Sequence, residues 1–251
     1  MRGNKRVFIG GLVALSTFAA GGGQAEEQAA PDDGNQAQTE RKIAETLGKI
    51  VFVPHDLGAP AVTDAGGVRA VSVLPKVELL APERMARTLS SAPTLYWHIS
   101  KAAIGPVRFT LLADDPTAID PLLEIEVDGV DQEGIYGVSL DDHGLSLESG
   151  ERYVWSVAVS SDGAGYGADL VAQTVLAHAA APELAQTLDS VAPEDRAVRL
   201  ASEGYWYDAI DTVSGEIGGA SGQTWHTARA SLLDQAGLLQ AARFDRGQAE
   251  Q

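Results

Sequence analysis

The chain has 251 residues, of which 45% are hydrophobic and 21% charged, as expected for a globular protein rather than a disordered or fibrous one. Its 18 basic and 35 acidic residues give a net charge of -17, which argues against nucleic acid or an anionic membrane surface as the main partner. Because the chain has no cysteine, disulfides, thiolate metal sites and cysteine nucleophiles are excluded.

Residues 1–25 have the pattern of a secretory signal peptide. A basic start is followed by an apolar stretch at 7–20, and Gly23 and Ala25 place small residues at the two positions that signal peptidase reads. A retained anchor and a buried N-terminal helix are the alternatives, and the short apolar stretch fits them less well. We therefore expect an exported protein, periplasmic or secreted, with no membrane span after cleavage.

Residues 26–45 are expected to form a flexible acidic leader, because residues 26–40 show no apolar periodicity. Residues 46–181 then alternate between apolar and polar positions in short runs that turn residues separate. This pattern predicts a mainly β domain, an antiparallel, immunoglobulin-like sandwich of about eight strands. Trp97 and Trp155 are expected to point into its core. The predicted strands are residues 49–53, 68–74, 94–99, 107–112, 122–127, 135–140, 152–159 and 170–178.

The apolar period changes to that of a helix after residue 181. Residues 182–240 are expected to form a tail of two or three helices packed on the sandwich, with breaks at Gly204 and at 218–222. The spacing of Gly204, Trp206 and Ala209 is similar to the corner of a tetratricopeptide hairpin, although an ordinary helical hairpin fits equally well. Residues 241–251 are expected to be disordered.

No catalytic, cofactor-binding or metal-binding motif stands out. The five histidines are dispersed without metal-ligand spacing and are expected to lie at the surface or half-buried. Neither a Gly-x-Ser-x-Gly nor a Ser-x-x-Lys motif occurs, so a serine hydrolase lacks its usual local signature. We therefore expect no cofactor, no metal and no catalytic residues.

The most unusual stretch is 109–151, which contains twelve acidic residues and no lysine or arginine. Clustered carboxylates can bind calcium, and a pair of them can hydrolyse glycosides. The alternative is that aspartates supply turns and the other carboxylates face solvent. The sequence leaves these alternatives open.

Six segments follow one another in an order that resembles the exported bacterial family called domain of unknown function 928. They are residues 58–60 (GAP), 66–69 (GGVR), 93–97 (PTLYW), 134–140 (GIYGVSL), 147–155 (LESGERYVW) and 204–209 (GYWYDA). The resemblance covers roughly residues 50–240. It implies export and a β-rich body with a helical tail, and it implies no activity.

These observations favour an exported, non-enzymatic protein that binds another envelope or extracellular protein. The candidate partner-binding residues are Tyr205, Tyr207 and Asp208, since Trp206 is expected to be buried and its neighbours to lie at the edges of that helix face. A calcium-dependent carbohydrate or small-molecule binding module is the alternative. A hydrolase acting on an extracellular substrate is the third hypothesis.

Overall fold

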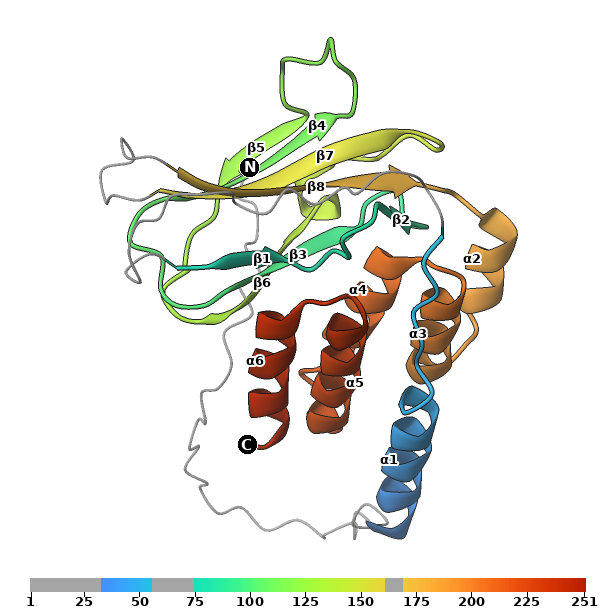
Figure 1. Ribbon diagram of the computed structural model, residues 1–251. Helices are drawn as coiled ribbons and strands as arrows, with labels where there is room; N and C mark the ends of the chain where they lie inside the picture. The colour runs from blue at the N-terminus through green and yellow to red at the C-terminus, as the bar shows by residue number, and fades with distance from the viewer. Residues whose placement is uncertain (1–32, 56–74, 161–168) are drawn as a thin grey trace, which may run out of the picture.

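A computed structural model describes residues 33–55, 75–160 and 169–251, and these residues form a β-rich body with a helical tail (Figure 1). The predicted signal peptide and the predicted strand at 68–74 lie outside the described residues. The strands are β1 (Val77–Leu79), β2 (Ala86–Thr88), β3 (Thr94–Ile99), β4 (Val107–Ala113), β5 (Leu123–Glu126), β6 (Gly134–Ser139), β7 (Arg152–Ser160) and β8 (Asp169–His178). The helices are α1 (Asp33–Leu47), α2 (Pro182–Leu188), α3 (Pro193–Ser202), α4 (Trp206–Glu216), α5 (Gly222–Gln235) and α6 (Leu239–Ala249), with a short 3-10 turn at Asp141–His143.

The strands form two sheets, one in the order β1-β3-β6 and the other in the order β2-β8-β7-β4-β5. All of the strand pairs are antiparallel except β2 and β8, which are parallel. The expectation of a wholly antiparallel sandwich is therefore wrong at this edge. The predicted strand at 49–53 is also wrong, because the segment has no strand partner among the described residues.

The core between the two sheets consists of side chains from alternate strand positions. On β3, Leu95, Trp97 and Ile99 are fully buried. The Trp97 ring lies 6.5 Å from Phe109 on β4, and Phe109 lies 6.1 Å from Trp155 on β7. These contacts confirm that Trp97 and Trp155 point into one core.

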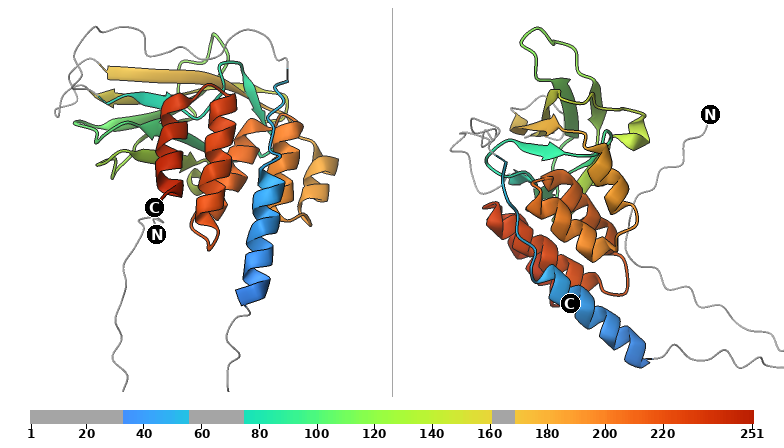
Figure 2. Two further views of the ribbon diagram at one scale, coloured as in Figure 1. Left: turned by 60° about the horizontal axis from the view of Figure 1, so that its bottom comes forward. Right: turned by 90° about the vertical axis from the view of Figure 1, so that its right-hand side faces the viewer.

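The tail covers the outer face of the three-stranded sheet, so that this sheet lies between helices and the larger sheet (Figures 1 and 2). Five helices follow β8 in the described chain, not two or three. The left-handed Gly204 (φ +78°) ends α3, since the Gly204 N–H donates to Ala201 and the next N–H donates to Leu200. A Cβ at Gly204 would lie 2.8 Å from both the Val53 oxygen and His55 Nδ1, so only glycine fits this corner.

Two segments that sequence analysis left without structure are helices. Residues 33–47 form α1 rather than a flexible leader, because Ile43 and Leu47, four residues apart, pack on the core. Residues 241–249 belong to α6 rather than to a disordered end, and Ala241, Ala242 and Asp245 are fully buried. Among the described residues, no helix is both long and apolar enough to cross a membrane.

Residues 50–53 join the helices rather than a sheet. Ile50 and Phe52 are buried, and Phe52 packs edge-on against Trp206 at 4.7 Å. The Gln235 side chain accepts from the Phe52 N–H at 2.9 Å and donates to the Ile50 oxygen at 3.1 Å. The predicted sandwich boundary at residue 46 therefore falls within the helical layer.

Candidate functional site

The start of α4 is buried on all sides. Tyr205, Trp206 and Tyr207 all lie in the core, which confirms Trp206 as buried and contradicts the edge positions expected for the two tyrosines. The Trp206 Nε1–H donates to the Leu80 oxygen at 2.8 Å, and the Trp155 Nε1–H donates to the Tyr207 hydroxyl at 3.2 Å. Burial raises the pKa of Tyr207 well above its usual value. The Tyr207 hydroxyl is therefore inside the core and is not presented to a partner.

The two tyrosines are buried because the regular helix spacing that placed them at the edges of one face does not apply to these residues. Tyr205 precedes α4 and has non-helical backbone angles (φ -86°, ψ 76°), so its ring turns back toward Arg87, whose guanidinium lies 4.2 Å from the ring centroid. The first turn of α4 packs against β2 and β3 (Figure 1), which covers the side of the helix that was expected to face solvent.

Asp208 points toward β2 rather than outward. Its carboxylate accepts from the backbone N–H of Leu89 at 2.7 Å and of Ser90 at 2.9 Å, and from the Thr88 hydroxyl at 3.3 Å. Burial raises the pKa of Asp208 to about 6, although these donors act in the opposite direction. The partner-binding role of Tyr205, Tyr207 and Asp208 stays a prediction, but all three side chains already contact other parts of the chain.

A hollow that the sequence did not predict lies where α6 crosses the three-stranded sheet. The helix is fixed at its start because the Glu78 carboxylate of β1 accepts from the Ala241 N–H at 2.8 Å, which satisfies a free donor of the first turn. It is fixed in its middle because Arg229 of α5 donates two hydrogen bonds of 2.7 Å to Asp245. His226 Nδ1 lies 2.9 Å from the same carboxylate.

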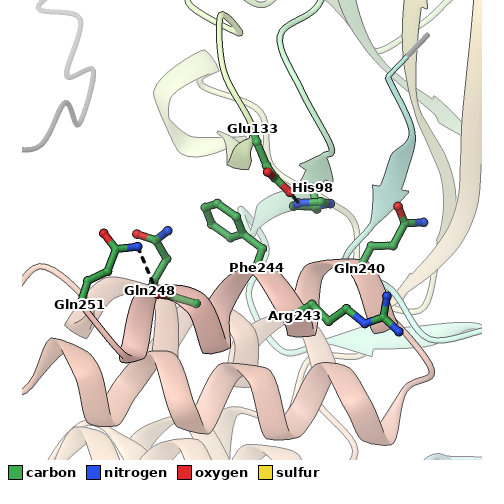
Figure 3. A pocket seen from close by; sticks show the side chains of 8 residues that line it. His98, Glu133, Gln240, Arg243, Phe244, Gln248 and Gln251 are labelled. Atoms are coloured by element: carbon green, nitrogen blue, oxygen red, sulfur yellow. Dashed lines mark hydrogen bonds and ion pairs between the residues drawn. The ribbon is translucent and has the colours of Figure 1, made fainter. Parts of the chain in front are cut away.

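These contacts hold one face of α6 over His98 of β3 and leave a hollow of about 440 Å³ between them (Figure 3). Glu133, directly before β6, lies on the opposite side of the hollow from the helix. Most of the lining residues are polar, although much of the surface that they present is apolar: His98, Glu133, Gln240, Arg243, Phe244, Gly247, Gln248 and Gln251.

His98 is the buried polar group of this hollow. Its side chain is 2% exposed, and its ring lies 5.4 Å from the Phe244 ring. Its Nε2 lies 3.5 Å from Glu133 Oε1, and neither ring nitrogen has a hydrogen-bond partner among the described residues. Burial lowers the pKa of His98 more than the nearby Glu133 and Asp245 carboxylates raise it. The imidazole is therefore neutral at pH 7 and offers one donor and one acceptor.

The lining offers a carboxylate, an imidazole, a guanidinium group and three amides. None of the eight lining residues is a serine, threonine, cysteine or lysine, so no side-chain hydroxyl, thiol or amine of the lining lies beside His98. Within residues 33–55, 75–160 and 169–251, no three His, Asp or Glu side chains come together to hold a metal ion. Arg243 and Glu133 carry opposite charges, so the lining has no net charge when His98 is neutral.

The acidic stretch forms no group that could hold a metal ion within the described residues, although Glu126, Asp128 and Asp131 line another hollow. Asp114 pairs with Arg152 at 3.1 Å, Asp115 accepts from Thr117 within its own turn, and Glu133 lines the hollow. The histidines differ from expectation, because His98 and His178 are both buried.

Sequence analysis included Glu133 in the acidic stretch and His98 among the dispersed histidines, but it assigned neither to a site. Gln240, Phe244 and Gln248 of α6 recur every four residues, as do Arg243 and Gly247 of α6 and Gln251 just beyond its end, so these residues form one continuous stripe. That spacing was visible in residues 241–251, but only Phe244 supplied an apolar signal there. The position of the stripe opposite His98 depends on the tertiary fold and has no local signature.

These features define a class of protein with a β-rich body, a helical tail and a hollow between α6 and the three-stranded sheet. The chain belongs to the family described as Domain of Unknown Function (DUF928), whose model matches residues 65–244. This match confirms the resemblance and spans five of the six sequence segments, all but residues 58–60, and it includes His98, Glu133 and Phe244.

None of the curated proteins matches this sequence. An engineered protein of known structure is 21% identical with a TM-score of 0.29, over 44% of this chain and 21% of that one. Astrotactin-2, described as a conserved vertebrate-specific and perforin-like membrane protein involved in neuronal development, is 14% identical with a TM-score of 0.30, over 86% of this chain and 47% of that one. The chain thus spans less than half of either structure, and likenesses this low carry no argument about fold or function.

Proposed function

We propose that this chain is an exported, non-enzymatic binding protein that recognises a molecule of the cell envelope or the extracellular space. The observation that supports this best is the hollow under α6, where the Phe244 ring lies among the polar side chains of Glu133, Arg243 and Gln248 (Figure 3). Sites that bind small molecules combine apolar surface with a few polar groups that orient the ligand.

Export is proposed from the signal-like pattern of residues 1–25. It also agrees with the exported family that the sequence resembles. If export occurs, mass spectrometry of the native protein will find an N-terminus near Glu26. Recovery of the protein with Met1 still attached would contradict the proposal.

We further propose that the sandwich is immunoglobulin-like and that α3 and α4 form a tetratricopeptide-like hairpin. The strand order supports the first part, since β1 pairs in one sheet and β2 pairs in the other. The Glu148 N–H donates to the Tyr153 hydroxyl at 2.8 Å near the start of β7, similar to the tyrosine corner of such domains. The left-handed Gly204 between α3 and α4 supports the second part.

Site-specific photo-crosslinking tests the binding function in the native envelope. A benzophenone amino acid in place of Gln248, which lines the hollow, should give a covalent adduct under light. The matched control is Gln223, an exposed glutamine of α5 that does not line the hollow. An adduct at both positions, or at neither, would contradict a binding site under α6.

A further inference from the structure

The charges of the lining narrow the chemical class of ligand that the hollow can bind. Arg243 is its cation and Glu133 its anion, and His98 is neutral because burial lowers its pKa. A single arginine offset by a carboxylate does not favour a phosphate or a polyanion, and the net charge of -17 repels both. With Phe244 as its large apolar side chain, the lining does not favour a lipid either.

The hydrogen-bonding groups of the lining narrow the class of ligand further. The amides of Gln240, Gln248 and Gln251 each offer both a hydrogen-bond donor and an acceptor. A hydroxyl group is itself both donor and acceptor, so a ligand with several hydroxyls can satisfy such a lining. Glu133 and Arg243 add planar groups that can each bind two neighbouring hydroxyls.

Phe244 gives the lining its one aromatic ring, directed from α6 into the hollow beside His98 (Figure 3). The C–H face of a pyranose ring is apolar and packs on an aromatic ring, while its hydroxyls point outward in the plane. A volume of about 440 Å³ lies within the range of small-molecule sites.

We propose that the hollow under α6 binds a neutral saccharide, with a sugar ring packed on Phe244 and hydroxyls bonded to Glu133 and Gln248. This inference rests on the proposed binding function and names the chemical class of its ligand. It uses the Phe244 ring and the polar side chains around it (Figure 3), and it requires no calcium ion.

Calorimetric titration of the full chain with three neutral trisaccharides, cellotriose, maltotriose and triacetylchitotriose, tests the proposal. At least one should bind with one-to-one stoichiometry at concentrations up to about 5 mM. Phe244→Leu, which keeps an apolar side chain but removes the ring, should weaken that binding at least about tenfold. Glu133→Gln, at an exposed side chain whose replacement leaves the fold intact, should weaken it by about threefold to tenfold.

The matched control is a pair of exposed arginines on α6. Arg243→Gln alters the hollow and should weaken binding, whereas Arg246→Gln, outside the hollow and paired with Asp234, should not. Failure of all three sugars to bind, or binding that Phe244→Leu and Glu133→Gln leave unchanged, would overturn the saccharide class.

The same titrations separate the two proposals. If glycylglycine, a small zwitterion, binds at Phe244 and no sugar does, the saccharide is wrong and the binding function stands. If the sugar binds at this site but chromatography afterwards finds it cleaved, the saccharide stands and the non-enzymatic function is wrong.

Discussion

The two faces of the three-stranded sheet are both buried, but they are buried by different chemistry. The face toward the larger sheet carries Trp97 and other apolar side chains in contact with Phe109 and the strands beyond it. The face toward the helices carries Glu78, Tyr96 and His98, each of which meets a group from α4 or α6. The first interface is therefore held by apolar burial, and the second by single directed contacts.

This difference predicts how each interface responds to change. Apolar burial depends on area and volume, so removing a large side chain is costly and nearly independent of pH. A directed contact depends on protonation and on one partner, so its loss is smaller where water can replace it and larger where a charge stays buried. The four predictions below are ordered by expected effect.

The largest effect is expected in the sheet-to-sheet core. Trp155→Ala removes a fully buried ring and should lower the free energy of unfolding by about 4 kcal/mol, because a cavity remains. Urea unfolding at neutral pH measures it. The control is Val171→Ala at an exposed position of β8, which should change stability by less than about 0.5 kcal/mol. Equal effects from the two variants would show that the core is misassigned.

The next largest effect is expected within the helical layer. Asp245→Ala leaves the buried Arg229 guanidinium without its carboxylate and should cost about 3 kcal/mol. Asp234→Ala breaks the exposed pair with Arg246 between the same two helices and should cost less than about 1 kcal/mol. Chemical unfolding of both variants gives the comparison. If the exposed pair contributes as much as the buried one, burial does not decide the strength of these contacts.

A pH-dependent effect is expected where α4 meets β2. The folded protein holds the pKa of Asp208 at about 6, above its ordinary value of 3.8, so the folded state binds this proton more tightly than the unfolded state. The resulting stability is fully present below 3.8 and is lost as the pH rises through about 6. Relative to Asp208→Asn, the wild type should therefore lose on the order of 1–3 kcal/mol between these limits.

Comparing the two proteins at each pH removes the contributions of other groups. His98 has the opposite sign, because burial lowers its pKa and its protonation destabilises the folded state as the pH falls below 6.5. Since His98 is present in both proteins, its contribution cancels in the difference. A difference that stays constant between pH 4 and 7, or rises with pH, would contradict the raised pKa of Asp208.

The smallest effect is expected at a single neutral donor. Tyr96→Phe removes the hydroxyl that donates to Asp211 at 2.8 Å and should cost about 1 kcal/mol. Tyr136→Phe removes an exposed hydroxyl that donates to the Gln132 oxygen, and it should cost less than about 0.5 kcal/mol. Thermal unfolding distinguishes the two. A loss as large as that of Trp155→Ala would place Tyr96 among the core contributors.

The same comparison explains what the sequence could and could not predict. Alternation along β3 predicted both the strand and its apolar face, because burial against the other sheet needs apolar side chains at every second position. The polar positions Tyr96 and His98 gave no sign of burial, since a polar face is usually solvated and only the helices from the far end of the chain cover it. The strands β1 and β2 are three residues each, too short to show a period.

The helices also show that a buried face without large apolar side chains is hard to predict from the sequence. Trp206 and Trp225 gave the apolar signal that predicted α4 and α5. By contrast, α6 contributes Ala241 and Ala242 to the core, and its Asp245 is buried in an ion pair with Arg229. Small residues and a paired charge do not stand out in a hydrophobic pattern. The hollow therefore escaped prediction because it requires both a buried polar strand face and an inconspicuous helix.

The contact between Phe52 and Gln235 has a consequence for the order of folding. It joins residues 183 positions apart, so it can form only after a long loop has closed, whereas α3 to α6 contact their neighbours in sequence. The helices can therefore assemble early from local contacts, and the segment at 50–53 docks onto them late. A segment that docks late should detach first under mild denaturant. Hydrogen exchange at the Phe52 and Val53 amides should therefore be fast compared with exchange at the amides of β7.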